Sequence, residues 1–239
     1  MSNLRFKAVI SASKKKPLHV EAPSERPSEY YGKYVFNRAK MYKYLPSKIY
    51  DQMINVIDNG APFDRSIADA VAAGMKQWAE ENGVTVSLDT QWDPVEKWAM
   101  DWKNVLPHVT VFLPNEKELM ALTGTSDVEE AIAAVQPYLG NAMVVKMGSK
   151  GSLLIKKDGS RNFLASFLNK EVVDAIGAGD SFNSGFISAF VAGHSLEDCQ
   201  RNGNLTGAIN TTAAGGTGAF ASREAAEKTA KEKFNVELL

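Results

Sequence analysis

Short apolar runs alternate with helical patterns along the chain after Gly83. Four of these runs are rich in Val, Leu and Ile, and they lie at residues 84–89, 109–114, 142–148 and 152–157. Continuous apolar strands that alternate with helices are typical of a mostly parallel sheet covered on both faces. The pattern therefore predicts an α/β fold, with a further antiparallel strand at residues 161–167.

Two helices of this region can be placed from the spacing of their side chains. Ser126 and Glu129 have the spacing of a capping box, and four apolar residues then share one helical face: Val128, Ile132, Val135 and Leu139. A second helix is predicted at residues 181–193, after a strand that ends at 172–174. Its buried side is expected to consist of Phe182, Phe186, Phe190 and Val191.

The first 83 residues follow a different pattern. Residues 1–34 lack sustained periodicity and predict an extended arm. Apolar spacing then predicts one helix that ends at Gly60, and another that begins with Asp64 and ends at Gly83. We therefore expect a small helical segment at 1–83 and an α/β domain at 84–239.

Composition and charge narrow the class of protein. The 239 residues are 44% hydrophobic and 23% charged, with a net charge of −1. Residues 1–50 contain eleven Lys and Arg against three Asp and Glu, and such an arm is more often a solvated surface than a nucleic-acid site. There is one cysteine, Cys199, and the three histidines lack metal-ligand spacing. With no signal peptide and no apolar run of transmembrane length, these features predict a cytoplasmic protein that binds neither nucleic acid nor membranes.

The segment "VVDAIGAGDSFNSGF" places small residues and an acid where a helix is expected to begin. Gly177, Ala178 and Gly179 would present backbone N–H groups at the helix N-terminus, where an anion is favoured. Asp180 would lie beside them, placed to take a proton from a hydroxyl while the amides hold a phosphoryl group. The alternative is a plain strand–turn–helix in which Asp180 only stabilises the helix start.

Three motifs, taken together, point to one enzyme family. They are "VFLPNEKELMALTG" (111–124), "VVKMGSKG" (144–151) and "DAIGAGDSFNSGF" (174–186). Over about residues 80–239 the chain resembles the ribokinase-like, phosphofructokinase-B-type sugar kinases. The resemblance implies a Rossmann-like, mostly parallel sheet with flanking helices. It also implies transfer of the γ-phosphoryl group of ATP to a hydroxyl of a sugar or sugar acid.

The same resemblance implies roles for the residues around the glycine-rich turn. Asp180 matches the catalytic base, and Gly177, Ala178 and Gly179 match the anion hole. Asp174 matches an acid that helps to hold a monovalent cation such as K⁺.

Nucleotide and metal contacts are implied for other segments. Asn115 and Glu118 match an Asn-x-x-Glu motif that organises Mg²⁺ and the ATP phosphates, with Glu118 acting through water. Contacts to the nucleotide itself are implied for Gly148 and Gly151, and for Gly218 and Ala219 within residues 215–220. The alternatives are that Asn115 and Glu118 only begin a surface helix and that residues 215–220 only form a turn.

Two residues depart from the family pattern. Ala175 stands where the family usually has Thr, and Gln91 stands where members often have Asn. Neither residue is the expected base or part of the anion hole, so we expect them to tune activity rather than abolish it.

The N-terminal segment resembles a different enzyme. "RPSEYYGKYVFNRAKMYKYLP" (26–46) and "GAPFDRSIADAVAAGMKQWA" (60–79) are similar to the N-terminal segment of type III glutamine synthetases. The resemblance covers about residues 1–82 and excludes that family's metal-binding glutamates, so it implies no ligase activity. The chain therefore looks like a fusion of two partial genes.

Three functional hypotheses follow. The first is a sugar kinase whose turnover is impaired, because nothing in residues 1–83 matches the family's sugar-contacting motif or lid. The second is a nucleotide-binding remnant, and the third is an interaction module that associates with glutamine synthetase. Loss of neighbouring strands would leave an open sheet edge. Unless the helices of residues 35–82 cover it, this edge predicts poor solubility or self-association into a homo-oligomer. The sequence does not identify the sugar.

Overall fold

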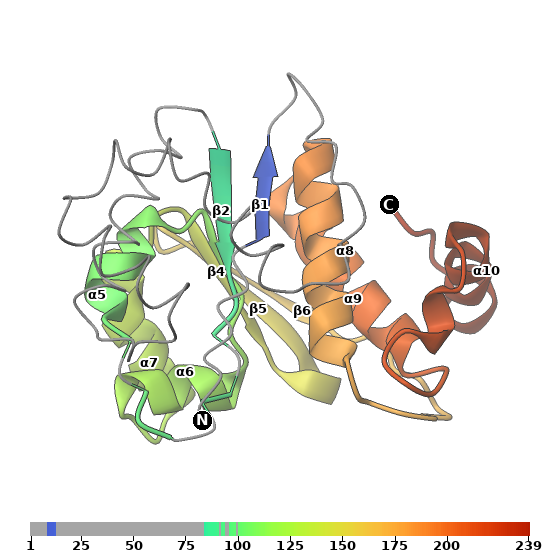
Figure 1. Ribbon diagram of the computed structural model, residues 1–239, viewed down its shortest axis with the longest axis horizontal. Helices are drawn as coiled ribbons and strands as arrows, with labels where there is room; N and C mark the ends of the chain where they lie inside the picture. The colour runs from blue at the N-terminus through green and yellow to red at the C-terminus, as the bar shows by residue number, and fades with distance from the viewer. Residues whose placement is uncertain (1–8, 13–83, 91, 94–95, 99) are drawn as a thin grey trace, which may run out of the picture.

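A mixed β-sheet forms the centre of the molecule (Figure 1). The computed structural model describes residues 9–12, 84–90, 92–93, 96–98 and 100–239. Within them the strands lie in the order β1-β2-β3-β4-β5-β6. Their bounds are Val9–Ala12, Val84–Leu88, Val111–Phe112, Ala142–Lys146, Gly151–Lys156 and Arg161–Ala165. The pairs β2–β3 and β3–β4 are parallel, and the pairs β1–β2, β4–β5 and β5–β6 are antiparallel. The α/β fold and the antiparallel strand predicted at 161–167 are confirmed.

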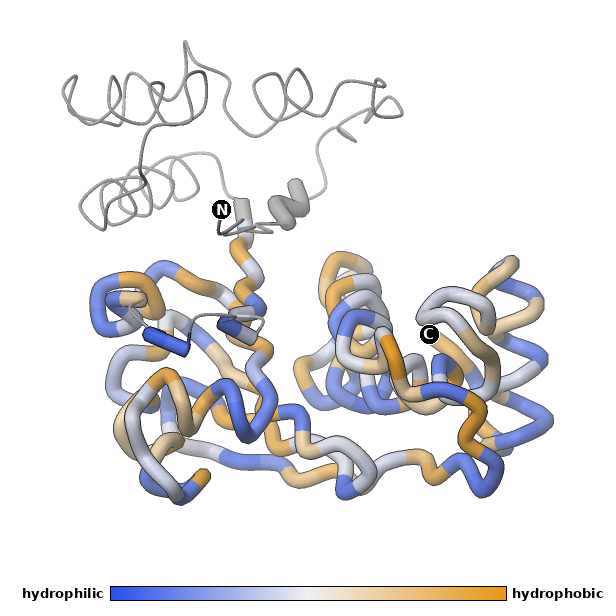
Figure 2. Tube along the Cα trace, turned by 60° about the horizontal axis from the view of Figure 1, so that its bottom comes forward, coloured by the Kyte–Doolittle hydropathy of each residue, from blue (hydrophilic) through white to orange (hydrophobic). Residues whose placement is uncertain are grey.

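Helices cover both faces of this sheet (Figures 1 and 2). Helices α5, α6 and α7 lie on one side, α8 and α9 lie on the other, and α10 lies beyond α9. Their bounds are Trp102–Val105, Glu116–Thr123, Val128–Val135, Ala178–Ala192, Leu196–Asn210 and Arg223–Phe234. Short 3₁₀ helices η1, η2, η3 and η4 occupy Leu106–His108, Gln136–Tyr138, Gly148–Lys150 and Gly218–Phe220.

The strands separate two hydrophobic cores, because successive side chains point to opposite faces of a sheet. One core lies under α6 and α7, and its strand residues are Phe112, Met143, Val145 and Ile155. The other lies under α8 and α9 and takes the alternate positions Val111, Leu113, Val144 and Leu154. Phe182 and Phe186 of α8 and the buried Cys199 of α9 complete this second core.

Helices α8 and α9 pack closely because α8 has a glycine where they meet. A Cβ at Gly185 would overlap the side chain of Thr206. The Thr206 hydroxyl donates to the backbone oxygen of Ser181 at 2.8 Å. This contact fixes the first turns of α8, which carry the glycine-rich turn, against α9.

Three local predictions were wrong. Residues 172–174 form no strand: Val172 and Val173 are 60% and 61% exposed, and the Val173 amide donates to the Thr211 carbonyl instead of to a strand. The cap of α7 is Asp127 rather than Ser126, because the Asp127 carboxylate accepts from the first amides of the helix. Val191 is 45% exposed rather than buried.

The predictions for residues 1–83 largely lie outside the described residues. The predictions outside them are the helix that ends at Gly60, the helix from Asp64 to Gly83 and most of the arm at 1–34. Gln91 also lies outside the described residues. Within the arm, residues 9–12 are described and form β1. No helix in the described ranges is long and apolar enough to cross a membrane.

Candidate active site

The three parallel strands bring polar residues to one edge of the sheet. Asp89 follows β2, Asn115 follows β3, and Lys146 is the last residue of β4. A parallel bridge between Asn115 and Lys146 extends the pairing of β3 and β4 to this edge. Ligands of open α/β sheets bind outside the carboxyl ends of the strands, so the fold favours a binding site here.

Asn115 and Glu118 form a reciprocal cap at the start of α6. The Asn115 side chain accepts from the Glu118 amide at 2.9 Å, and Glu118 Oε2 accepts from the Asn115 amide at 2.9 Å. Glu118 is only 6% exposed, and burial raises the pKa of its carboxyl above the ordinary value, although the Asn115 amide opposes this shift. The pair therefore has a helix-capping role in this fold, and its buried carboxylate faces the same edge as Asp89 and Lys146, which also act on its pKa.

The glycine-rich turn leads directly into α8. Gly177 is the N-cap and has a φ of 78°, a backbone conformation that glycine adopts without strain. The Ala178 amide closes a turn onto the Ala175 carbonyl at 3.2 Å. Among the described residues, the amides of Gly177, Gly179 and Asp180 donate to no protein acceptor. Gly179 and Asp180 are exposed residues, so the start of α8 and the Asp180 carboxylate are open to a ligand.

A buried asparagine holds this turn in place. Asn210, the last residue of α9, is 1% exposed. Its Oδ1 accepts from the Ser181 hydroxyl at 2.9 Å, and its Nδ2 donates to the Ile176 carbonyl at 2.8 Å. Ile176 and Ser181 flank the turn, so one amide group fixes both of its ends.

The loop at 215–220 lies against the same turn. Asp174 accepts from the Ile176 amide at 2.9 Å and from the Gly215 amide at 3.0 Å. These bonds, the Gly215 bond first, lower the pKa of the Asp174 carboxyl below its ordinary value. A Cβ on Gly177 would lie 2.9 Å from Gly216 Cα, so two backbones meet here. Gly218 and Ala219 belong to η4 of this loop.

The two glycines of the 148–151 turn have different surroundings. Gly148 is exposed, has a φ of 58° and would meet nothing within 4 Å if it carried a Cβ. Gly151 is buried, and a Cβ there would overlap the Leu164 carbonyl oxygen of β6. Gly148 thus leaves room for a ligand, whereas Gly151 permits close packing of β5 on β6.

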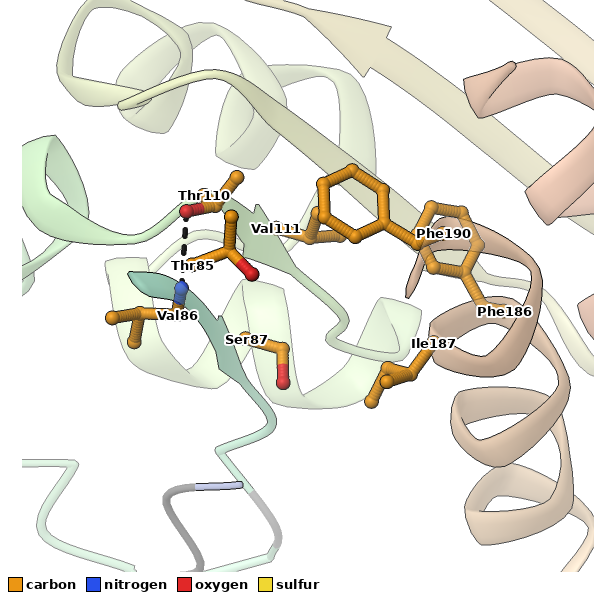
Figure 3. A pocket seen from close by; sticks show the side chains of 8 residues that line it. All are labelled: Thr85, Val86, Ser87, Thr110, Val111, Phe186, Ile187 and Phe190. Carbon is orange, nitrogen blue, oxygen red and sulfur yellow. Dashed lines mark hydrogen bonds between the residues drawn. The ribbon is translucent and has the colours of Figure 1, made fainter. Parts of the chain in front are cut away.

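A separate hollow lies between the sheet and α8 (Figure 3). Its lining consists of Thr85, Val86, Ser87, Thr110, Val111, Phe186, Ile187 and Phe190. None of the residues expected to act in catalysis or nucleotide binding lines it. The hollow therefore does not define the candidate site.

The structure thus brings the candidate residues together in three groups. Asp174 and Gly177 lie against the loop of Gly218 and Ala219, Asn115 lies with Glu118, and Gly148 and Gly151 form a turn after β4. Sequence reasoning missed Lys146, which pairs with Asn115, and Asn210, which bonds the Ile176 carbonyl. It also missed Asn183, which contacts Lys146. Only Lys146 carried a usable signal, as a charged residue at the end of an apolar strand.

The fold is a mixed, mostly parallel α/β sheet with flanking helices, and it has a glycine-rich turn at the start of α8. Residues 54–222 match the pfkB family carbohydrate kinases, and the chain belongs to that family. The match begins ahead of the boundary expected near residue 83.

Individual relatives agree with both resemblances. An 85-residue stretch is 42% identical to a glutamine synthetase from Bacteroides fragilis and covers 36% of this chain and 12% of that protein. An uncharacterized sugar kinase from Archaeoglobus fulgidus is 32% identical over 124 residues, which are 52% of this chain and 48% of the relative. The chain therefore spans less than half the length of each of these relatives.

Solved structures show the same fold. The structure of Arabidopsis thaliana ribokinase complexed with ribose and ATP superposes with a TM-score of 0.58 at 27% identity. The superposed region covers 67% of this chain and 52% of the ribokinase chain.

Proposed function

We propose that this protein is an ATP-dependent carbohydrate kinase that transfers a phosphoryl group to a hydroxyl of a sugar or sugar acid. The observation that carries the proposal is the position of Asp180. It is exposed in the first turn of α8, beside the Gly177 and Gly179 amides that donate to no described acceptor. Membership of the pfkB family supports the same reaction class.

In this proposal Asp180 is the general base. The acceptor oxygen forms a bond to the γ-phosphorus while the bond between that phosphorus and the β–γ bridging oxygen breaks. The proton of the acceptor hydroxyl passes to the Asp180 carboxylate, and ADP leaves. The Gly177 and Gly179 amides, together with the dipole of α8, stabilise the charge on the transferred group. We assign the Ala178 amide a smaller part in this stabilisation, because it already donates to the Ala175 carbonyl.

We assign Mg²⁺ and the phosphates of ATP to the edge that carries Asn115 and Glu118. Mg²⁺ keeps most of its waters and binds few protein carboxylates, so one buried glutamate is a sufficient anchor. In the described ranges no group of three or more His, Cys, Asp or Glu is arranged to hold a metal alone, which fits an ion held mainly by phosphates and water. The ion would neutralise charge on the phosphates. A monovalent cation at Asp174 would have to share a carboxylate that already accepts two amides.

A second candidate is a nucleotide-binding protein with weak turnover. This candidate is favoured because the chain matches only part of its relatives' length, 48% in the case of the Archaeoglobus kinase. Kinases depend on residues that position the acceptor and exclude water. A chain with only the phosphate-binding residues would bind ATP and transfer its γ-phosphoryl group slowly. Association with a glutamine synthetase is a third candidate, suggested by the 85-residue similarity.

One experiment separates these candidates. ADP release is measured with ATP, Mg²⁺ and a panel of sugars and sugar acids, and ATP binding is measured by calorimetry on the same preparation. The kinase proposal expects release that depends on the acceptor and disappears in Asp180→Asn. Binding without release supports the weak-turnover candidate. Release that persists in Asp180→Asn contradicts the role of Asp180, and co-purification with glutamine synthetase supports the third candidate.

A further inference from the structure

Lys146 belongs to a polar cluster that none of the expected roles includes. Its side chain is only 12% exposed, and its Nζ lies 3.0 Å from Asp89 Oδ2 and 3.2 Å from Asn183 Oδ1. Asn183 Nδ2 also donates to Asp89 Oδ2. The cluster therefore joins the carboxyl ends of β2 and β4 to the second turn of α8.

This cluster lies directly beside the glycine-rich turn. Lys146 Nζ is 3.8 Å from the position that a Cβ on Gly179 would take, which is ordinary van der Waals contact. The cluster is also close to Glu118, since Asp89 raises the pKa of the Glu118 carboxyl and Lys146 lowers it. The ammonium thus stands between the two groups assigned to the phosphates, Asn115–Glu118 and the start of α8.

Lys146 also has hydrogen-bonding capacity beyond its two partners. An ammonium group has three N–H donors, and Asp89 and Asn183 accept two of them. The third donates to no described residue. A mostly buried ion pair offers little net stability compared with a packed apolar pair, so stability alone is a weak reason for a lysine here. Its position beside an anion-binding turn provides a stronger reason.

We infer that Lys146, held by Asp89 and Asn183 beside Gly179, donates its third N–H to the terminal phosphate of a bound nucleoside triphosphate. Asp89 and Asn183 are positioning residues that aim the ammonium at this phosphate. The inference rests on the proposed function, since it assigns a contact within the same phosphate site. A hydrogen bond from a charged ammonium to a phosphate is stronger than one from a neutral backbone amide.

The test compares affinities for ATP, ADP and AMP, measured by calorimetry with the full chain. Lys146→Met removes the charge and keeps the stem. It is expected to weaken ATP binding about tenfold, the loss of one charge-assisted hydrogen bond, and to leave AMP binding unchanged. Lys146→Arg keeps the charge and is expected to retain most of the preference for ATP over AMP.

Lys156→Met is the matched control. Lys156 lies at the other end of the β4–β5 hairpin, where it pairs with Glu197 at 2.6 Å, and its loss should leave all three affinities unchanged. If the Lys146→Met variant does not fold, Lys146→Gln tests the same point with a neutral side chain that still donates hydrogen bonds.

The outcomes separate the inference from the proposed function. If the unmodified chain binds ATP and the neutral variants weaken ATP and AMP equally, or neither, the inference is overturned and the proposed function stands. If the unmodified chain binds no nucleotide, the proposed function fails and the inference fails with it. If Lys146→Met selectively loses affinity for ATP and Lys146→Arg keeps it, both the inference and the proposed function are supported.

Discussion

The carboxylate of Asp174 accepts a hydrogen bond from the backbone amide of Gly215 at 3.0 Å, across 41 positions of the sequence. This bond joins the approach to the glycine-rich turn to the loop at 215–220. Together with the close approach of Gly177 to Gly216, it fixes the position of the two segments relative to each other.

Replacement of Asp174 should release the 215–220 loop. Asp174→Ala removes the acceptor for the Gly215 and Ile176 amides, so both should exchange with solvent faster. Hydrogen-exchange mass spectrometry of peptides that contain residues 174–176 and 215–216 measures this. Asp174→Asn, which keeps one oxygen acceptor, should show a smaller change, and equal protection in all three proteins would contradict the role.

The same bond has a defined pH dependence. The Asp174 pKa is lowered by the Gly215 amide and then by the Ile176 amide, so its folded value lies below its unfolded value, which is about 3.9. The stabilisation is therefore present above the unfolded pKa and is lost as the pH falls through the folded pKa. Faster exchange of the Gly215 amide, corrected for intrinsic rates, should appear below about pH 4 in the unmodified chain but not in Asp174→Ala.

Asn210→Ala should destabilise the fold because it removes a buried side-chain amide that makes two hydrogen bonds. The change leaves the Ser181 hydroxyl and the Ile176 carbonyl without the amide that pairs them, at a cost of about 1–3 kcal/mol. Urea denaturation measures the change in the free energy of unfolding. Asn141→Ala, at an exposed asparagine, is the control and should stay within about 0.5 kcal/mol of the unmodified chain.

Gly177→Ala should be more harmful than the same change at Gly124. Both glycines have a positive φ, 78° and 71°, which costs alanine about 1–2 kcal/mol. Only at Gly177 would the new Cβ also meet another backbone, at 2.9 Å from Gly216 Cα, whereas Gly124 has nothing within 4 Å. Urea denaturation of the two variants should differ by at least about 1 kcal/mol. ATP affinity should fall only for Gly177→Ala, and equal effects of the two changes would show that φ alone decides.

The raised pKa of Glu118 predicts that the folded chain loses stability as the pH rises above the ordinary pKa of a glutamate. Burial raises its pKa in the folded state, so the folded chain holds this proton more tightly than the unfolded chain. The contribution is fully favourable below the unfolded pKa of about 4.3 and is lost as the pH rises through the folded pKa. Glu118→Gln cannot ionise and keeps an acceptor for the Asn115 amide, so it should remove this pH dependence. Urea denaturation between about pH 4 and pH 7 measures it, and parallel profiles would contradict the assignment.

Much of the sheet could be predicted from sequence because its strands are buried on both faces. Val144 and Val145 face different cores, so an uninterrupted apolar run is what such a strand requires. Val172 and Val173 have the same local composition but form no strand and are exposed, a difference that depends on the tertiary fold.

The site was predictable only in its local parts. The Asn115–Glu118 cap spans three positions and follows from helix geometry. The contact of Lys146 with Asp89 spans 57 positions, and that of Asn210 with Ser181 spans 29. Such contacts arise from the order of the strands and the packing of α8 on α9, which no local spacing encodes.

Because Cys199 is buried, its reaction with thiol reagents can report local unfolding of the native chain. Burial raises the pKa of the thiol to about 11, so at neutral pH it is protonated as well as inaccessible. It is the only cysteine in the sequence, so any modification by a thiol reagent is confined to this one sulfur. The rate at which such a reagent labels the native protein therefore reports how readily the core around Cys199 opens, without any engineered probe.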